Sequence, residues 1–404
     1  MKKNIIISFL AFAVASVLPT VSFAQQRSDW MSKISDDTYV CSMSIPGTHD
    51  SCTYGADGVI TGHYARCQYY NLEEQFDFGI RCFDFRPTAQ IDDKTMLYHL
   101  SEYNGHFNME VFRKEQEITH GPIPCNITFV DAMKTIIDLI KKHPSEFAII
   151  MVNQESSSNE DYNEIALAAT QCTEWLLSQE NPGMFVEFRP DLKLGDVRGK
   201  ILIINRDDFN SSYKNGHTFH FICKELIWEV LPGGTSRSKI IDHDDVMTCI
   251  DLPSYQPVGA FTVNFGDEDG IGYLRTKNKD NFEGQARMFS QDNYNPSSLE
   301  KKQASFTNTA YKYFRDIDYY SWCFNNVSGY LGEGMKMSYE QLSLIKYFIS
   351  DEFIKSGSIF FTFPYPGSWH RLGIVMEDFA GDIVDRDTGK TFEERIIGMN
   401  PFEQ

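Results

Sequence analysis

The stretch SIPGTHDSC, residues 44–52, decides which fold and which chemistry to expect from this chain. It places a histidine and a carboxylate, His49 and Asp50, side by side behind a proline and a glycine. A short, mostly apolar run, TYVCSM at 38–43, precedes it and predicts a β-strand. We therefore expect a Pro-Gly turn to lift His49 and Asp50 from the end of that strand onto one edge of a sheet.

Strand-like runs alternate with amphipathic stretches along the rest of the chain. Alternating strands and helices indicate a parallel sheet with helical crossovers. At this length the expected fold is α/β, a distorted (βα) TIM-like barrel, with an open doubly wound sheet as the alternative. Apolar spacing predicts helices at 128–142, 161–179, 297–313 and 339–353. The predicted strands are 38–43, 80–85, 147–152, 200–205, 319–325 and 372–378.

We expect a single catalytic domain over residues 25–404. The chain shows no internal repeat, no low-complexity tract and no linker rich in proline, glycine or serine. Two stretches interrupt the alternation, near 88–118 and near 207–288, and the second is glycine-rich and acidic in parts. Both are predicted to be insertions on the core.

Residues 1–24 have the features of a cleaved signal peptide. Lys2 and Lys3 form a positive start, an apolar stretch follows, and Ser22-Phe23-Ala24 is a small-x-small cleavage site. A membrane anchor is the alternative, but the apolar stretch is short for a span. We expect a secreted or periplasmic protein.

The charge and the cysteine content disfavour several kinds of partner and of site. A net charge of −19 disfavours nucleic acid and electrostatic attachment to anionic membranes. The chain has 9 cysteines and no CxxC pair, which disfavours a structural zinc site. Export would permit disulfides, with Cys52–Cys67 and Cys41–Cys82 as candidates, although sequence does not settle the pairing.

Polar residues follow the ends of several predicted strands. Taken singly, each has an ordinary structural explanation: a histidine is often a hydrogen-bonded structural residue, and Asp84 with Arg86 would make a salt bridge. In a βα barrel, however, these strand ends gather on one face, where active sites are built. The residues so placed are His49, Asp50, Asp84, Arg86, His120, Arg206, Glu377 and Asp378.

Two histidines, carboxylates and an arginine are sufficient for phosphodiester cleavage. A neutral imidazole accepts the proton of the attacking hydroxyl, and a protonated imidazole donates one to the leaving oxygen. Carboxylates hold the tautomer or the charge of each ring. The planar guanidinium matches a phosphate and stabilises charge that builds on its oxygens.

The order of motifs resembles the X-region of phosphatidylinositol-specific phospholipase C in its secreted bacterial form. SIPGTHDS is followed by IRCFDFRP, HGPI, PSEFAIIM and KILIINR. The resemblance runs from about 38 to 206 and resumes near 289–330 and 372–379. It implies cleavage of phosphatidylinositol to diacylglycerol and inositol 1,2-cyclic phosphate.

The resemblance also assigns roles to particular residues. His49 is similar to the family's general base, His120 to its general acid, and Asp378 to the carboxylate that orients the base. Asp50 matches the residue that works with arginine at the phosphate, and Asp84 with Arg86 matches the D-x-R pair. The inositol-contacting positions correspond to Arg206, Asp292 and Tyr294. Where the family has a lysine, this chain has Asn153-Gln154-Glu155, a departure that concerns head-group recognition.

Arg86 also bears on the question of a metal. Calcium-dependent relatives have a carboxylate at this position, so the resemblance implies an enzyme that needs no metal and no cofactor. One alternative is a metal-dependent glycerophosphodiester or sphingolipid phosphodiesterase of the same barrel class. Another is a catalytically inactive barrel that binds a glycan or lipid.

The expected partner is phosphatidylinositol in a membrane, contacted peripherally by a monomer. With a strongly negative chain, aromatic insertion would have to supply much of the affinity. Phe363, Tyr365 and Trp369, in the segment FFTFPYPGSWH, are candidates for that insertion. The alternative is that these rings pack in the core.

Overall fold

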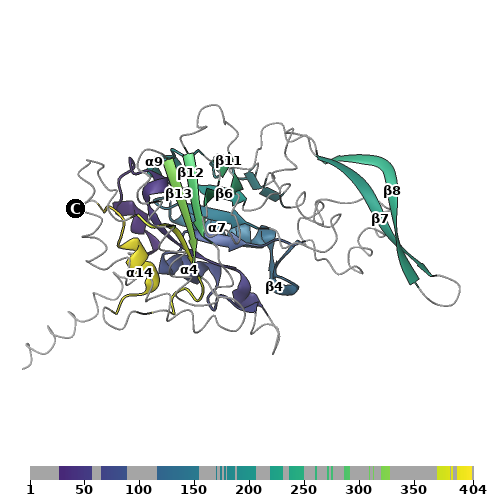
Figure 1. Cartoon of the computed structure of the whole chain (residues 1–404), viewed down its shortest axis with the longest axis horizontal. Coiled ribbons are helices and arrows are strands. Elements are labelled where there is room, and N and C mark those ends of the chain that lie inside the picture. Colours follow the sequence, from purple (N-terminus) through teal and green to yellow (C-terminus); the bar gives the residue numbers. More distant parts are fainter. Residues whose placement is uncertain are drawn as a thin grey trace, which may run out of the picture.

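The computed structural model describes the parts of the chain that build the sheet and its surroundings (Figure 1). Within strands β7 to β12 only the backbone is described. The described stretches of five or more residues are 27–56, 65–88, 116–153, 180–186, 189–205, 219–230, 236–249, 286–291, 320–327, 371–382 and 389–402, and shorter pieces lie between them.

One sheet organises the described part of the chain. Its strand order is β10-β12-β13-β14-β1-β2-β5-β6-β9-β11. Neighbours from β12 through to β9 are parallel, and β10 and β11 add antiparallel edges. The last strand, β14, pairs with the first, β1, so the sheet curls back on its own beginning. This is the arrangement that a βα barrel requires.

The central strands of this sheet are β1 (Ser44–Thr48), β2 (Cys82–Phe85), β5 (Ala148–Val152), β6 (Ile201–Asn205), β13 (Tyr320–Asn326) and β14 (Gly373–Glu377). The remaining strands of the sheet are β9 (Ala260–Phe261), β10 (Ile271–Gly272), β11 (Leu274–Arg275) and β12 (Ala286–Gln291). Two hairpins stand apart from it, β3 (Glu117–His120) with β4 (Ile123–Thr128), and β7 (Phe219–Val230) with β8 (Ser236–Cys249). The helices are η1 (Trp30–Lys33), η2 (Val40–Ser42), η3 (Thr53–Gly55), α4 (Leu72–Phe78), α7 (Phe129–Lys142), α9 (Leu194–Val197) and α14 (Phe392–Ile397).

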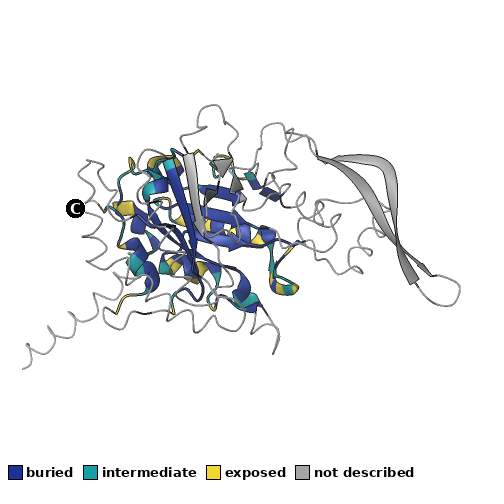
Figure 2. Cartoon of the chain, in the orientation of Figure 1, coloured by how far each residue is buried: buried dark blue, intermediate teal, exposed yellow. Residues whose placement is uncertain are grey.

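Side chains alternate between the two faces of the central strands, as the pleat requires. One face carries Ile45, Cys82, Met151 and Ile374, which form a core cluster with Trp30 and other N-terminal residues. The opposite face carries Phe83, Phe85 and Ile150, which pack against α4 and α7. The first face is therefore the interior of the curled sheet, and the helices cover its outside. Figure 2 shows the buried residues along these strands.

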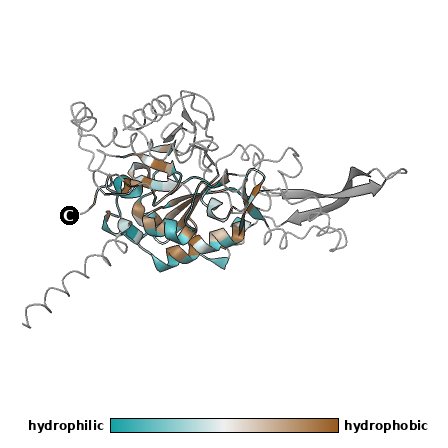
Figure 3. Cartoon of the chain, turned by 90° about the horizontal axis from the view of Figure 1, so that it is seen from below, coloured by the Kyte–Doolittle hydropathy of each residue, from teal (hydrophilic) through white to brown (hydrophobic). Residues whose placement is uncertain are grey.

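Helix α7 forms where apolar spacing predicts a helix, at 128–142. Thr128 caps its first turn by accepting from the amide of Asp131, and Lys141 and Lys142 lie in its last turn. Its buried side includes Phe129, Met133, Ile136 and Ile140. Figure 3 shows hydrophobic and hydrophilic residues sharing the described helices, as expected where one side faces the sheet and the other faces water.

Helix α4 has boundary signals that are plain in the sequence. Asn71 and Glu74 form a reciprocal capping box at its start. It ends at Gly79, whose φ of 106° places it in the left-handed region. A Cβ at Gly79 would lie 2.5 Å from Cδ1 of Ile397, so the chain needs glycine there for space as well as conformation.

The prediction of a strand at 38–43 is wrong. That segment contains the short helix η2, and the strand begins at Ser44. Pro46 and Gly47 therefore lie inside β1 instead of forming a turn. A Cβ at Gly47 would meet Sδ of Met376 at 2.5 Å and Cβ of Cys82 at 2.9 Å. The glycine is needed because neighbouring strands approach closely, a constraint that local sequence does not reveal.

The other predicted strands within the described residues are confirmed to within two residues of each end. The hairpin strands β3, β4, β7 and β8 and the sheet strands β9 to β12 were not predicted. At 161–179 and 297–313, the individual residues that are described are helical. The predicted helix at 339–353 lies outside the described residues, as do residues 1–24.

Residues 89–115, most of the first predicted insertion, lie outside the described residues. The β7–β8 hairpin and strands β9 to β11 fall within the second, 207–288. The domain boundaries stay predictions.

The candidate disulfides are not formed. Cys41, Cys52, Cys67 and Cys82 are all buried free thiols. No helix in the described part of the chain combines the length and the apolar composition needed to cross a bilayer.

Candidate active site

The interior face of three neighbouring strands ends in polar side chains. Along each strand, apolar or small residues point inward at alternate positions until the carboxyl end, where the next inward position is ionisable or polar. Because β14, β1 and β2 are adjacent and parallel, these positions meet at one edge. The series are Ile45, Gly47, His49 on β1; Cys82, Asp84, Arg86 on β2; and Ile374, Met376, Asp378 on β14.

His49 is held between a carboxylate and a guanidinium. Its Nδ1 lies 3.0 Å from Oδ1 of Asp378, and its Nε2 lies 2.7 Å from an amino nitrogen of Arg86. Arginine only donates, so Nε2 is the acceptor and Nδ1 carries the hydrogen that Asp378 receives. A lone pair on Nε2, with a carboxylate behind Nδ1, is the state that a general base requires.

Arg86 is bound by carboxylates from two strand ends. Its Nε donates to Oδ1 of Asp50 at 2.7 Å, and an amino nitrogen donates to Oδ2 of Asp84 at 2.9 Å. Arg86 as a whole is 7% exposed. Its fork is therefore held in one orientation beside the Nε2 of His49, where a phosphate oxygen would find donors already in place.

Asp50 lies at the centre of the cluster. It is a non-glycine residue with a φ of 46°, and its amide donates to Oδ2 of Asp84 at 3.2 Å. Its two carboxylate oxygens face different partners. Oδ1 binds Arg86, whereas Oδ2 lies 3.3 Å from Nε2 of His49 and 3.5 Å from Nε2 of His120.

His120 approaches from the β3–β4 hairpin, opposite His49. Its Nδ1 lies 2.8 Å from the carbonyl oxygen of Ala65, which accepts only, so Nδ1 carries a hydrogen. Nε2 is thus the atom that exchanges a proton beside Asp50. His120 is 26% exposed at its side chain, while His49 is 4% exposed, so the cluster opens on the His120 side.

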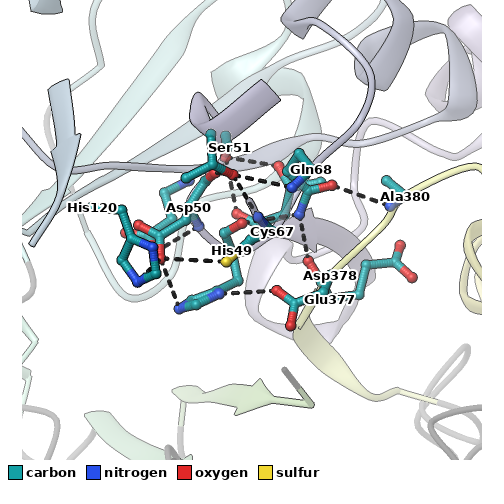
Figure 4. Close-up of polar contacts among 12 residues, drawn as sticks. His49, Asp50, Ser51, Cys67, Gln68, His120, Glu377, Asp378 and Ala380 are labelled. Atoms are coloured by element: carbon teal, nitrogen blue, oxygen red, sulfur yellow. Dashed lines mark hydrogen bonds and ion pairs between the residues drawn. The ribbon is translucent and has the colours of Figure 1, made fainter. Parts of the chain in front are cut away.

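The structure brings together His49, Asp50, Asp84, Arg86, His120 and Asp378 from four separate segments. Figure 4 shows His49 and His120 on either side of Asp50. The predicted inositol-contacting residues Arg206, Asp292 and Tyr294 lie outside the described residues, as do Phe363, Tyr365 and Trp369. The roles given to all these residues stay predictions.

Sequence reasoning missed Gln68, which ties two strand ends together. Its amide nitrogen donates to the carbonyl oxygens of His49 and Glu377, each at 2.9 Å, and its oxygen accepts from the amide of Ala380 at 3.1 Å. These bonds fix the relative positions of the His49 and Asp378 backbones. A lone glutamine in a loop carries no motif, so no sequence signal could have identified it.

Sequence reasoning also missed the thiol of Cys67 as part of the site. Its Sγ lies 3.8 Å from Oδ2 of Asp50. Burial, together with the charges of Asp378 and Asp50, raises the pKa of this thiol well above its usual range. Within the described residues, three overlapping groups have metal-ligand spacing: His49, Cys67 and Asp378; Asp50, Cys67 and His120; and His49, Asp50 and Asp84.

Comparison with known families assigns this region. Residues 43–207 match the family model described as phosphatidylinositol-specific phospholipase C, X domain. This region is therefore similar to the PI-PLC X domain. The match begins just before β1 and ends just after β6, so the matched region contains His49, Asp50, Asp84, Arg86 and His120, whereas Asp378 follows the last strand and lies outside the match.

Curated relatives agree with the assignment of the X domain. A 1-phosphatidylinositol phosphodiesterase of Listeria monocytogenes is 28% identical over 185 residues, covering 44% of this chain and 48% of the relative. One of Staphylococcus aureus is 25% identical over 185 residues, covering 46% of this chain and 53% of the relative. The matches thus span about half the length of these relatives.

Solved structures confirm the fold over a longer stretch. The phosphatidylinositol-specific phospholipase C of Listeria monocytogenes superposes with a TM-score of 0.54 at 19% identity, covering 93% of this chain and 99% of that one. The enzyme from Staphylococcus aureus, solved in work on its membrane binding, gives 0.58 at 16% identity, covering 94% and 99%. The expected α/β barrel class is confirmed, and the open doubly wound alternative is set aside.

Proposed function

We propose that the protein is a phosphatidylinositol-specific phospholipase C, a phosphoric diester lyase that releases diacylglycerol and inositol 1,2-cyclic phosphate. One observation carries the proposal: the Nε2 atoms of His49 and His120 approach the same carboxylate oxygen, Oδ2 of Asp50, from different segments, at 3.3 and 3.5 Å. Two imidazoles around one point, beside a guanidinium, are arranged for a proton to leave one side of a phosphate and arrive at the other.

In the proposed reaction, His49 is the general base. Its Nε2 accepts the proton of the inositol 2-hydroxyl, whose oxygen then bonds to phosphorus. This hydroxyl takes the place of the Arg86 donor that lies 2.7 Å from Nε2. Asp378, 3.0 Å from Nδ1, stabilises the imidazolium that forms.

His120 is the general acid. As the bond between phosphorus and the diacylglycerol oxygen breaks, protonated Nε2 of His120 gives its proton to that oxygen. The Asp50 carboxylate lies 3.5 Å from this Nε2. At the end of the step His49 holds one proton more and His120 one fewer, and exchange with water restores both.

Arg86 stabilises the negative charge that develops on the phosphate oxygens. Asp50 and Asp84 hold the guanidinium in place, so little reorganisation is needed when charge appears. The same ion pairs disfavour the alternative of a metal-dependent phosphodiesterase, because Arg86 occupies the carboxylates that a catalytic calcium ion would use. The ordered acid, base and guanidinium disfavour an inactive binding barrel.

We also propose that the protein is exported, and that it acts on phosphatidylinositol at a membrane surface as a peripheral monomer. Export rests on the signal-peptide features of residues 1–24. The membrane substrate follows from the proposed reaction and agrees with the printed description of membrane binding for the Staphylococcus aureus enzyme.

The test is turnover of phosphatidylinositol vesicles by the full mature chain in excess chelator. We expect diacylglycerol and a cyclic inositol phosphate, identified by the phosphorus NMR shift of the five-membered cyclic phosphodiester. Sphingomyelin and glycerophosphodiesters should remain intact. Cleavage that stops on adding chelator, or an acyclic phosphate as the first product, would contradict the proposal.

A further inference from the structure

Cys67 places a sulfur atom in a centre whose proposed reaction does not use it. The side chain is buried, and its Sγ lies 3.8 Å from Oδ2 of Asp50 and 3.6 Å from the carbonyl oxygen of Ala65. Ala65 also binds Nδ1 of His120. The short segment 65–67 therefore positions both the imidazole and the thiol beside the same carboxylate oxygen (Figure 4).

We infer that Asp50, Cys67 and His120 form a site for a thiophilic divalent cation, zinc above all, and that occupancy of this site inhibits the enzyme. Donor atoms of these three residues lie within 4.8 Å of one another. Nε2 of His120 and Sγ of Cys67 lie 3.5 and 3.8 Å from Oδ2 of Asp50. Tetrahedral zinc with ordinary bond lengths separates such ligands by about 3.3 to 3.6 Å, so the two distances to Oδ2 of Asp50 need to shorten by only a few tenths of an ångström.

The orientation of His120 suits a metal ligand. A ligating histidine typically donates its second N–H to a carbonyl or carboxylate, which fixes the ring and directs the other nitrogen at the metal. The Nδ1 contact of 2.8 Å with Ala65 does this. In the neutral ring, Nε2 directs a lone pair at a carboxylate oxygen, an arrangement that needs either a proton or a cation between the two atoms.

The two carboxylate oxygens of Asp50 have different partners, so a cation can bind one oxygen while Arg86 stays bound to the other. Oδ1 of Asp50 faces Arg86 at 2.7 Å, whereas Oδ2 faces the thiol and the imidazole. The carboxylates of Asp50 and Asp84 bind the guanidinium of Arg86, and the carboxylate of Asp378 binds His49, so with both imidazoles neutral these groups have a net negative charge. His120, partly exposed, marks the side from which an ion enters.

The ligand chemistry selects the metal. A sulfur, an imidazole and one carboxylate suit zinc or cadmium, while calcium and magnesium prefer oxygen donors throughout. Without a metal, Cys67 is a buried free thiol. Metal binding replaces the thiol proton, which leaves to solvent as the sulfur–metal bond forms.

Inhibition follows from the proposed function, on which this part of the inference rests. A cation on Nε2 of His120 takes the position of the proton that the general acid must deliver. The enzyme would therefore need no metal for turnover and yet be inhibited by zinc, competitively with phosphatidylinositol.

The experiment measures metal binding directly and catalysis separately. Cobalt, which reports a sulfur ligand through a thiolate charge-transfer band, is titrated into the full mature chain, and zinc affinity is measured by calorimetry. The test variant is Cys67→Ser, and the matched control is Cys41→Ser, a buried free thiol outside the three ligand groups. In parallel, each variant's rate on phosphatidylinositol with zinc is divided by its own rate in chelator.

We expect one bound metal with a thiolate band in the wild type and in Cys41→Ser. In Cys67→Ser the band should disappear and zinc should bind at least about tenfold more weakly, with a matching loss of inhibition. Equal zinc affinity in Cys67→Ser and wild type, or no stoichiometric binding to the wild type, would overturn the inference even if phosphatidylinositol is cleaved. A protein that binds cobalt through Cys67 but cleaves no lipid would uphold the metal site and contradict the proposed function.

Discussion

Two buried arginines flank the same strand, and they serve different purposes. Arg81 immediately precedes β2 and Arg86 immediately follows it. Arg81 is fully buried, stacks over the ring of Phe76 with its Cζ 3.6 Å from the centroid, and pairs with Glu146 at 2.9 Å. Its other donors bind the backbone carbonyl oxygens of Phe76, Ile80, Ser28 and Arg27.

Arg86, by contrast, is bound by side chains that titrate. Asp50, Asp84 and His49 hold it at 2.7 to 2.9 Å. Backbone carbonyls cannot exchange their partner for a ligand without unfolding the chain, whereas side chains can rearrange around a phosphate. The comparison teaches that burial and charge alone do not identify a functional arginine; the identity and mobility of its acceptors do.

The largest effect is expected from the two histidines that lie beside Arg86 and Asp50. His49→Ala and His120→Ala should each reduce the rate of phosphatidylinositol cleavage about 10²- to 10⁴-fold, because each removes one proton transfer. Circular dichroism and thermal unfolding should show a folded protein in both. The control is His143→Ala, which removes a histidine that binds Asp29. Near-complete activity in either catalytic variant would contradict the acid–base assignment.

At the start of β2, loss of the Arg81–Glu146 ion pair should reduce the stability of the fold. Glu146→Ala leaves Arg81 charged and buried without its carboxylate, which is expected to lower the free energy of unfolding by about 3–5 kcal/mol. Burial raises the pKa of Glu146 despite Arg81, which shows how costly desolvation is at this position. Urea unfolding measures the change.

Replacing both partners sharpens this prediction. Arg81→Met with Glu146→Leu should recover much of the lost stability, because no buried charge remains. Activity per folded molecule should be retained in both variants. If the Glu146 variants lost much activity but no stability, Arg81 would not be a purely structural residue, and the contrast between Arg81 and Arg86 would be wrong.

Arg86→Lys removes the planar, forked guanidinium that follows β2 while keeping the positive charge. Activity should fall about 10²- to 10³-fold, the cost of losing an oriented donor to a developing oxyanion. The free energy of unfolding should change by less than about 1 kcal/mol. Arg189→Lys, at an exposed ion pair, is the matched control and should leave the rate unchanged.

The smallest effect concerns Glu377, which lies beside Asp378 but points to the outer face of the sheet. Burial and the carboxyl of Glu393 raise its pKa well above the ordinary value of 4.5. The folded state therefore holds a proton that the unfolded state releases once the pH exceeds about 4.5. Folding stability is thus reduced as the pH rises above that value, and the reduction is relieved as the pH falls.

Glu377→Gln removes this pH dependence. The gain in unfolding free energy of the variant over the wild type should grow by about 1 kcal/mol per pH unit between pH 5 and 6. Urea unfolding across this range, with Glu73→Gln on α4 as the control for formal charge, measures it. A difference that stays constant with pH would show that Glu377 is ionised in the folded protein.

The sequence by itself determined that most of the central strands alternate with helices, and with that the barrel class. It also identified the side chains that close β2 and β14 and those that follow β1, because alternation and strand ends are local features. The boundary of β1 was wrong, since the reason for Gly47 inside a strand is the closeness of Met376 and Cys82.

Only the tertiary structure decided which polar residues share a centre. His49 and Asp378 are 329 positions apart in the chain, and they meet because the last strand pairs with the first. Local sequence does not show which partners surround Arg81 and Arg86, and Cys67 and Gln68 carry no motif at all. Their surroundings come from segments that only the curling of the sheet brings together, and those surroundings set whether a buried charge fixes the fold, binds a phosphate or accepts a metal.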